Sequence, residues 1–532
     1  MTRLEGIIVD LHARRRFPGV VTIDNGRITS IREDDSVLAT HWIMPGYVDA
    51  HVHVESSMLV PSEFARLAVV HGTVATVSDP HEIGNVCGIE GVRYMLDNGA
   101  TVPFTFAFGA PSCVPATTFE TAGSEITADD IAELFRDERV RYLSEMMNWP
   151  GVLHEDATVM HKLDVARAHG RVIDGHAPGL RGDDARRYAS FGISTDHECF
   201  TLDEALDKVS AGMKILIREG SAARNFDALH PLFGLHPDRV MLCTDDMHPD
   251  SLVVGHINLL VRRALQHGYE LFDVLRAACL HPVTHYGLDV GLLREGDAAD
   301  CIITAADDPS TVFATFVRGQ CVAMNGSSHI SRRDVPVINR FSCEPISEHD
   351  IAVDTEGKQL RVIQAHDGQL VTTEVVGTQS DDDVLKIVVV NRYRQAQPAI
   401  GFIRGIGLHS GALASSVAHD SHNIVAVGTD DAAIVAAVNA VIAAKGGVSV
   451  HDGATTQVLP LPVAGLMSAG DGFDIARRYA ALDARAKELG STLRAPFMTL
   501  SFMALLVIPE LKMSDKGLFD GRQFAFTTMF VA

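Results

Sequence analysis

The sequence lacks several features that define large classes of proteins. Its 532 residues include eight cysteines, but these are scattered and form no CxxC pair, which fits a reducing compartment better than a disulfide framework. Basic residues are few: 45 Lys and Arg stand against 68 Asp and Glu, which gives a net charge of −23. Nucleic acids and anionic membranes bind basic surfaces, so we expect neither as a partner.

Long hydrophobic segments are also missing. The longest apolar run, near residues 432–444, is interrupted by Asn439 and is too short to span a bilayer. The first residues, MTRLEGIIVDLHARRRF, have neither the long apolar core nor the small-residue cleavage site of a secretory signal. With 46% hydrophobic and 21% charged residues, the composition is that of a soluble globular protein, which we expect in the cytoplasm.

The sequence pattern divides the chain into three regions, within the two to four domains that the length suggests. Residues 1–43 alternate short β-rich runs with turns such as Asp24-Asn25-Gly26, and residues 288–340 are again β-rich. We expect both segments to form one small β domain. Residues 344–532 mix strands with a helical stretch and predict a C-terminal α/β domain.

Between these regions, residues 44–287 alternate β-branched runs with helix-like stretches. The runs are YVDAHVHV, TVATVSDPHE, PFTFAFGA, RYLSEMM, RVIDGHAP, GISTDHE, KILIREG and RVMLCTDD. Eight strands alternating with helices predict an α/β fold of the (β/α)8 TIM-barrel type, with a doubly wound sheet as the alternative. Polar residues at the strand ends favour the barrel, because barrel enzymes keep their active sites there.

The strand ends carry the side chains that could do chemistry. In HVHVES, His51 and His53 share one face of a strand, since alternate residues point the same way. In a barrel all eight strand ends meet at one rim. The polar residues expected there are His51 and His53; Asp79, His81 and Glu82; Glu145; His176; Asp196, His197 and Glu198; Arg218 and Glu219; Asp245 and Asp246.

Each of these residues alone has a simpler interpretation. A single histidine at a strand end is more often hydrogen-bonded than metal-bound, and an acidic residue after a strand often caps the next helix. Together, four histidines and two carboxylates on one rim would be costly to desolvate without a cation. They match the needs of two divalent metals, and imidazole with carboxylate suits zinc, iron or manganese.

The same order of residues resembles the amidohydrolase superfamily: HxH on the first strand, a bridging acid on the fourth, histidines on the fifth and sixth, and Asp on the eighth. Many members have a carboxylated lysine on the fourth strand, where LSEMMNWPG places Glu145. This difference is similar to the bacterial adenine deaminases. Other stretches that resemble them, from about residue 5 to the end, are DPHEIGNV, SCVPA, DGHAPG, REGSAARN, CTDD, AHDSHNIV, LPLPVAGLMS and GLFDG…FAFTT.

The resemblance implies a binuclear manganese or iron(II) centre, with zinc possible, that converts adenine to hypoxanthine and ammonia in purine salvage. A hydroxide between the metals would attack the carbon bearing the amine, and Asp245 would pass its proton to the leaving nitrogen. The sequence departs from the family at Met247, where many members have Arg, and in a short or absent N-terminal extension. By position, one metal would be held by His51, His53 and Asp245, the other by His176 and His197, with Glu145 bridging.

The acid that protonates the ring nitrogen is left open. Glu219 and Glu198 are the candidates, with Glu82 as a third; the alternative for Glu219 is a salt bridge to an arginine or a helix cap. Glu55 would orient a ligand histidine, or else cap the segment that follows it. Arg218, Ser112, Asp246 and His422 complete the residues expected to contact the substrate or support the site.

Several wider questions also stay open. The stretch VAHDSHNI (417–424) is interpreted, with slight preference, as a buried polar turn that holds domains together, and otherwise as a loop over the barrel mouth. The substrate could be an N6-substituted adenine or another amino-purine. A cyclic amidohydrolase would need lysine in place of Glu145, and a non-catalytic scaffold would not need the full ligand set. We expect a homo-oligomer, with a dimer favoured.

Overall fold

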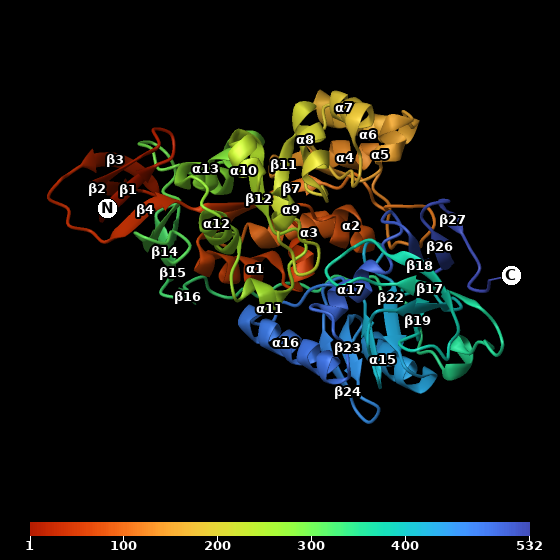
Figure 1. The fold of residues 1–532 in the computed structure, drawn as a ribbon. Helices are drawn as coiled ribbons and strands as arrows, with labels where there is room; N and C mark the ends of the chain where they lie inside the picture. The colour runs from red at the N-terminus through yellow and green to blue at the C-terminus, as the bar shows by residue number, and fades with distance from the viewer. Residues whose placement is uncertain (532) are drawn as a thin grey trace.

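Eight short parallel strands in the middle of the chain close into a barrel in the computed structural model, which describes residues 1–531 (Figure 1). They form a five-stranded and a three-stranded sheet whose edges meet. The strands are β5 (Tyr47–Val52), β6 (Thr73–Ser78), β7 (Thr105–Ala110), β8 (Val140–Met146), β9 (Val172–Gly175), β10 (Thr195–Asp196), β11 (Lys214–Arg218) and β12 (Val240–Cys243). Each coincides with one of the predicted runs.

Two seams close the barrel and exclude the doubly wound sheet. At one, Ile173 pairs with Ile193 and joins β9 to β10. At the other, His53 N donates to Asp245 O at 3.1 Å and Asp245 N donates to His51 O at 2.9 Å, which joins β5 to the end of β12. The prediction of a (β/α)8 barrel is therefore confirmed.

Helices follow the strands, as the periodicity of the sequence predicts. Side-chain caps start several of them: Thr127 and Asp130 form a capping box at α4, and Thr201 caps α8. The helices of the barrel region are α1 (Pro61–Ala68), α2 (His81–Cys87), α3 (Ile89–Gly99), α4 (Ala128–Leu134), α5 (Trp149–Leu153), α6 (Ala157–Ala168), α7 (Gly182–Ser190), α8 (Leu202–Ser210), α9 (Phe226–Leu229), α10 (Leu232–Leu235), α11 (Pro249–Leu252), α12 (Ile257–Gln266), α13 (Leu271–Leu275) and α14 (His281–Tyr286).

Strands from both flanks of the barrel combine in one eight-stranded sheet, ordered β16-β15-β14-β13-β4-β1-β2-β3. The junction is antiparallel, with Ile303 of β13 opposite Ile43 of β4. The bounds are β1 (Thr2–Asp10), β2 (Arg15–Asp24), β3 (Arg27–Glu33), β4 (His41–Pro45), β13 (Cys301–Ala305), β14 (Val312–Val317), β15 (Gln320–Met324) and β16 (Ser327–Ser328).

A second eight-stranded sheet, ordered β18-β17-β20-β19-β22-β21-β23-β24, occupies the C-terminal region. Alternate residues of β22 face opposite sides: Ile424 and Ala426 pack in the core under α15, while Val425 and Val427 join the core shared with the barrel. The elements are β17 (Leu360–Gln364), β18 (Thr373–Gly377), β19 (Leu385–Val390), β20 (Ala399–Arg404), β21 (Ala412–Ser415), β22 (Ile424–Gly428), α15 (Asp431–Ala443), β23 (Gly447–His451), β24 (Thr456–Pro460), α16 (Gly472–Glu488), α17 (Pro496–Phe502), β25 (Leu511–Ser514), β26 (Gly517–Asp520) and β27 (Ala525–Phe526).

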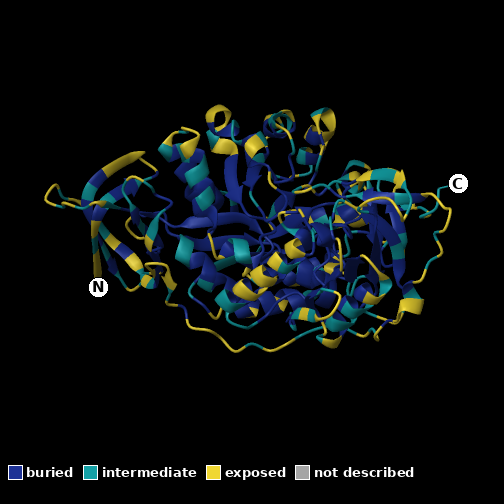
Figure 2. Ribbon diagram, turned by 60° about the horizontal axis from the view of Figure 1, so that its bottom comes forward, coloured by how far each residue is buried: buried dark blue, intermediate teal, exposed yellow. Residues whose placement is uncertain are grey.

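The barrel and the C-terminal sheet share one continuous hydrophobic core, so the two regions are packed together and not merely tethered. Figure 2 shows both sets of strands as buried, with exposure concentrated on outer helix faces and loops. Among residues 1–531, none of the helices combines the length and apolarity that a membrane crossing needs.

A buried ion cluster lies directly behind two of the expected metal-binding histidines. The Lys208 ammonium, with a fully buried side chain, lies 3.1 Å from Asp196 Oδ2 and 2.8 Å from Glu204 Oε1. It also donates to Ala177 O at 2.6 Å, while Ala177 N donates to Asp196 Oδ2 at 2.9 Å. Because Ala177 follows His176 and Asp196 precedes His197, this cluster fixes the backbone that carries both histidines.

Lys208→Met removes the cation and leaves two buried carboxylates unpaired. We expect the free energy of unfolding, measured by urea denaturation, to fall by about 3–5 kcal/mol. Lys487→Met is the matched control, because Lys487 forms the same i,i+4 pair with Asp483 at 2.5 Å but its side chain is 41% exposed. It should cost less than about 1 kcal/mol. Equal effects of the two substitutions would contradict this account.

Candidate metal centre and active site

Four histidines and two carboxylates from five strand ends converge at the carboxyl end of the barrel. His53 Nε2 lies 3.1 Å from Asp245 Oδ1, and His51 Nε2 lies 3.4 Å from the same oxygen. His197 stacks on His51, with ring centroids 4.0 Å apart. The six residues, His51, His53, Glu145, His176, His197 and Asp245, are all buried. The structure thus brings together every residue that the sequence pattern marks as a metal ligand.

Glu145 lies between the two halves of this cluster. Its Oε1 is 3.3 Å from His53 Nε2, on the side of the first strand. Its Oε2 is 2.6 Å from His176 Nδ1 and 3.1 Å from His197 Nε2. One carboxylate therefore faces both sets of histidines, which is the arrangement that a bridging ligand requires.

Asp245 reaches the cluster through an unusual backbone conformation. Its φ is 56°, a left-handed value that residues other than glycine rarely adopt. The two backbone hydrogen bonds to β5 at the barrel seam hold it there. Such conformations gather at functional sites, where the surrounding structure compensates for them.

The donor groups of the cluster fit divalent cations. The Nε2 atoms of His51 and His53 are only 3.3 Å apart, so they need a proton or a cation between them. Burial alone would raise the pKa of Glu145, but His176, His197 and His53 hold it well below its usual range. Imidazoles facing ionised carboxylates match zinc, iron and manganese.

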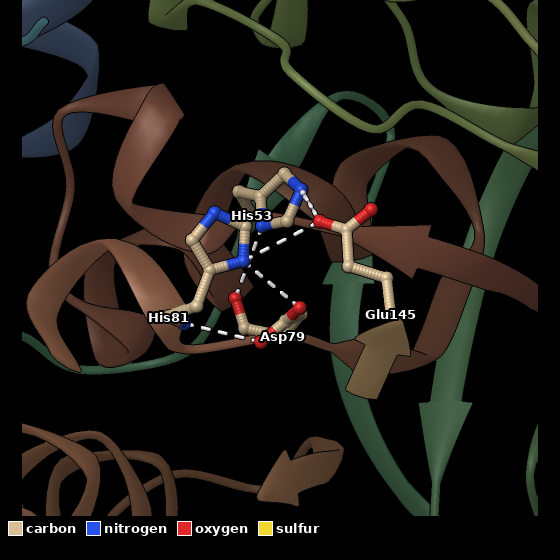
Figure 3. Close-up of side chains that lie close together, drawn as sticks. All are labelled: His53, Asp79, His81 and Glu145. Atoms are coloured by element: carbon tan, nitrogen blue, oxygen red, sulfur yellow. Dashed lines mark hydrogen bonds and ion pairs between the residues drawn. The ribbon is translucent and has the colours of Figure 1, made fainter. Parts of the chain in front are cut away.

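Two residues near the cluster were seen at a strand end but not assigned to the metal site from sequence. His81 Nδ1 lies 2.9 Å from Asp79 Oδ2 and 3.4 Å from Glu145 Oε1. Figure 3 shows His81 and His53 both directed toward Glu145, with Asp79 beside them. The signal was present in SDPHE, where both residues follow β6 as His53 of HVH follows β5.

Arg218 supplies the positive charge of the rim. Its Nη1 donates to Asp245 Oδ2 at 2.6 Å and also to Glu198 Oε1. Glu198 in turn lies 3.7 Å from the ring nitrogens of His176 and His197. Arg218 therefore pairs with two acids of the site, and both of its Nη atoms already donate to carboxylates.

The loop of the C-terminal region reaches the barrel rim. His419 Nδ1 and His422 Nε2 donate to the two oxygens of Glu82, one to each. The loop is also held at Asn423, whose side-chain Nδ2 donates to Thr121 O at 2.9 Å. The stretch VAHDSHNI thus holds the regions together and lies over the barrel mouth, so both interpretations of it describe part of its position.

A small cavity of about 20 Å³ lies between this loop and the cluster. Most of the expected metal ligands form its floor, with Glu198 and Asp246 beside them. Asp246 is buried and accepts a hydrogen bond from Ser56 Oγ at 2.5 Å. The wall facing the cluster consists of Leu370, His419, Asp420, Phe502 and Leu505, all from the C-terminal region.

Comparison with known proteins identifies the relatives of this chain. Residues 42–324 match the amidohydrolase family, and residues 361–525 match the adenine deaminase C-terminal domain. A protein named adenine deaminase from Salinibacter ruber is 56% identical over 99% of this chain and 99% of its own length. The chain belongs to the adenine deaminase family.

Other members of the adenine deaminase family are similar over the same extent. Proteins of that name from Sulfurovum sp. and Methanosarcina mazei are 53% and 50% identical. These matches cover 97% and 100% of this chain, and 98% and 100% of theirs. The resemblance inferred from short motifs is thereby confirmed for the whole chain, the C-terminal region included.

Neither Glu219 nor Ser112 lines the cavity, although the sequence offered both as site residues. Glu219 Oε2 lies 2.9 Å from Arg263 Nη1, and its Oε1 accepts from Phe226 N, so the salt-bridge alternative describes its position. Arg218, the last residue of β11, points into the barrel mouth, so the next residue, Glu219, points away from it. Ser112 Oγ donates to Glu145 O at 2.5 Å and supports the backbone.

Glu55 also has a different place from the one expected. Its Oε1 accepts from Ile83 N at 3.1 Å, in the first turn of α2, and it contacts no ligand histidine. The short helical turn at Val54–Ser57 directs it toward α2, which follows the second strand. Burial raises the pKa of Glu55 to about 7. Glu55 therefore caps a helix, but the helix is α2 and not the segment that directly follows Glu55, which the alternative interpretation had named.

Glu145→Gln should lower the metal content of the purified protein, because a neutral amide cannot serve both halves of the cluster. We expect a loss of at least one metal equivalent per chain after dialysis, measured by elemental analysis. Glu219→Gln is the matched control: it changes the same group outside the cluster and should keep the wild-type metal content. Full metal retention by Glu145→Gln would contradict the bridging position.

Proposed function

We propose that this chain hydrolyses adenine to hypoxanthine and ammonia with two divalent cations, manganese or iron(II), held by the six-residue cluster. The observation that carries the proposal is the full-length identity to proteins named adenine deaminase. The cluster supports it chemically, because a carboxylate, Glu145, stands between its two halves. His51, His53 and Asp245 would hold one cation, and His176 and His197 the other.

When bound, the cations supply Lewis acidity that lowers the pKa of water and so provides a nucleophile near neutral pH. Asp245 acts as the base: Arg218 pairs with its Oδ2 and favours the ionised form, leaving Oδ1 on the cluster side. Asp245 takes a proton from the attacking water and delivers it to the leaving amine nitrogen. Burial of the site excludes competing bulk water from these transfers.

Glu198 is the candidate for the group that protonates the ring nitrogen. It lines the cavity beside His176 and His197, within 3.7 Å of both. Both oxygens of Glu198 accept from Arg218, and those of Glu82 accept from His419 and His422, so the position of Glu198 beside His176 and His197 is what favours it. Glu219 is directed away from the cavity, toward Arg263.

We also propose a domain division, a cellular location and an oligomeric state for this chain. The domains would be residues 1–43 with 288–340, residues 44–287, and residues 344–532; the sheet shared by the two flanks and the separate core under α15 support this division. The scattered free cysteines and the net charge of −23 support a cytoplasmic enzyme without nucleic-acid or membrane partners. A homo-oligomer, with a dimer favoured, fits an enzyme of this size.

The manganese-loaded protein should release ammonia from adenine. We would measure the amine released by adenine, N6-methyladenine, 2,6-diaminopurine and guanine, which is methylamine for N6-methyladenine and ammonia for the others. Ring opening of a cyclic amide is followed by chromatography, and the metal-free protein is the control for every substrate. Release from adenine with no comparable release from the others would establish the substrate. Release from an N6-substituted purine in preference to adenine would revise it, and no release from any purine would overturn the function.

Asp245→Asn should lower kcat for adenine by about 10²- to 10⁴-fold, the range expected when a general base is removed. The comparison is made at equal metal occupancy, measured on the same samples, because Asp245 also stands among the expected ligands. Glu270→Gln on the protein surface serves as a control, since its carboxylate pairs with Arg14 outside the site. Wild-type turnover by fully metal-loaded Asp245→Asn would exclude the role of Asp245 as base.

A further inference from the structure

The wall that the C-terminal region gives to the cavity carries two polar atoms without hydrogen-bond partners, one of which, His419 Nε2, lies 3.9 Å from Asp246 Oδ1. His419 Nε2 and Asp420 Oδ2 are buried and have no hydrogen-bond partner among the described residues. Buried polar atoms of this kind are costly unless a ligand or water satisfies them. The wall is otherwise apolar, from Leu370, Phe502 and Leu505. Its two unpaired atoms therefore indicate a ligand with matching polar groups.

His419 is held in one orientation. Its Nδ1 donates to Glu82, and its ring stacks on Phe502 with centroids 4.5 Å apart and 15° between the planes. Burial alone would lower the pKa of His419, but the charges of Glu82 and Asp246 raise it to about 9. With both ring nitrogens protonated, His419 Nε2 is a hydrogen-bond donor on the cavity wall.

Asp420 stands close to the reacting end of the cavity. Its Oδ1 lies 3.9 Å from His81 Nε2, and His81 Nδ1 lies 3.4 Å from Glu145 Oε1. One imidazole ring therefore separates Asp420 from the centre of the cluster.

Adenine offers a complementary pair of groups on one edge: N7 accepts a hydrogen bond and the 6-amino group donates. We propose that His419 and Asp420 recognise this edge, with His419 Nε2 donating to the ring nitrogen and Asp420 Oδ2 accepting from the amine. Phe502 is a positioning residue that keeps the His419 ring in place. The inference rests on the proposed deamination and assigns substrate recognition to the C-terminal region.

The test uses the difference between substrate and product. Hypoxanthine has a carbonyl oxygen where adenine has the amine, so a carboxylate favours adenine and an amide can donate to hypoxanthine. In the manganese-loaded full chain, Asp420→Asn should raise KM for adenine about 10- to 100-fold and lower the inhibition constant of hypoxanthine. Asp483→Asn, a buried acid of the same region paired with Lys487, should change neither.

A second pair of variants guards against misfolding of the loop. Phe502→Leu removes the ring that stacks on His419 and should raise KM for adenine about 2- to 10-fold. Phe497→Leu is the control, because it lies on the same helix, is equally buried, and packs near Tyr479 away from the cavity. It should leave KM within about twofold of wild type. Equal effects of the two would contradict the positioning role.

Each other outcome has a distinct meaning. Loss of a metal equivalent in Asp420→Asn would overturn recognition in favour of a further cation at His81, Glu82 and Asp420. A fall in kcat with unchanged KM and hypoxanthine inhibition would overturn it in favour of proton transfer by Asp420. If wild-type protein releases no ammonia from adenine, the proposed function fails; if it does and Asp420→Asn behaves like Asp483→Asn, only the recognition pair fails.

Discussion

The seam between the first and last barrel strands is the constraint on which the site depends. The two backbone hydrogen bonds between Asp245 and the residues of HVH close the barrel and set Asp245 beside both histidines. The hydrogen bonds that close the barrel therefore also place Asp245 at the cluster. The left-handed backbone of Asp245, unfavourable by itself, is held because its own N–H and C=O are both hydrogen-bonded at the seam. The remaining ligands follow from the strand order.

Burial of so many charges imposes the second constraint, since each ionised group needs a partner. Partners come from three directions. Lys208 lies behind β9 and β10 and neutralises Asp196 and Glu204, Arg218 pairs with Asp245 from β11, and the histidines of the C-terminal loop take both oxygens of Glu82. The buried His, Asp and Glu groups of the cluster itself are suited to hold a metal cation. The rim is therefore balanced by neighbouring elements and not by solvent.

The sequence predicted most of the barrel because two periodicities carry the information: alternation within strands and the spacing of helices between them. It predicted the convergence of six residues because strand ends of a barrel share one rim. It offered Glu219 as a candidate acid with a salt bridge as the alternative, and in the structure Glu219, which follows β11, pairs with Arg263 while Arg218 pairs with Asp245. Ser112 and Glu55 lie beyond the strands, where loop geometry decides direction and no period applies.

No local sequence pattern could predict the contact between the loop and Glu82, because His419 lies 337 positions along the chain from Glu82. This contact joins the barrel to a region that also has a core of its own under α15. Without the loop, Glu82 would lose His419 and His422 and keep only His81 as a histidine partner, and the wall opposite the cluster would lose His419 and Asp420. The barrel supplies reactive groups, and the second region encloses them. A site divided in this way lets substrate selection change through the loop while the groups at the seam stay as they are.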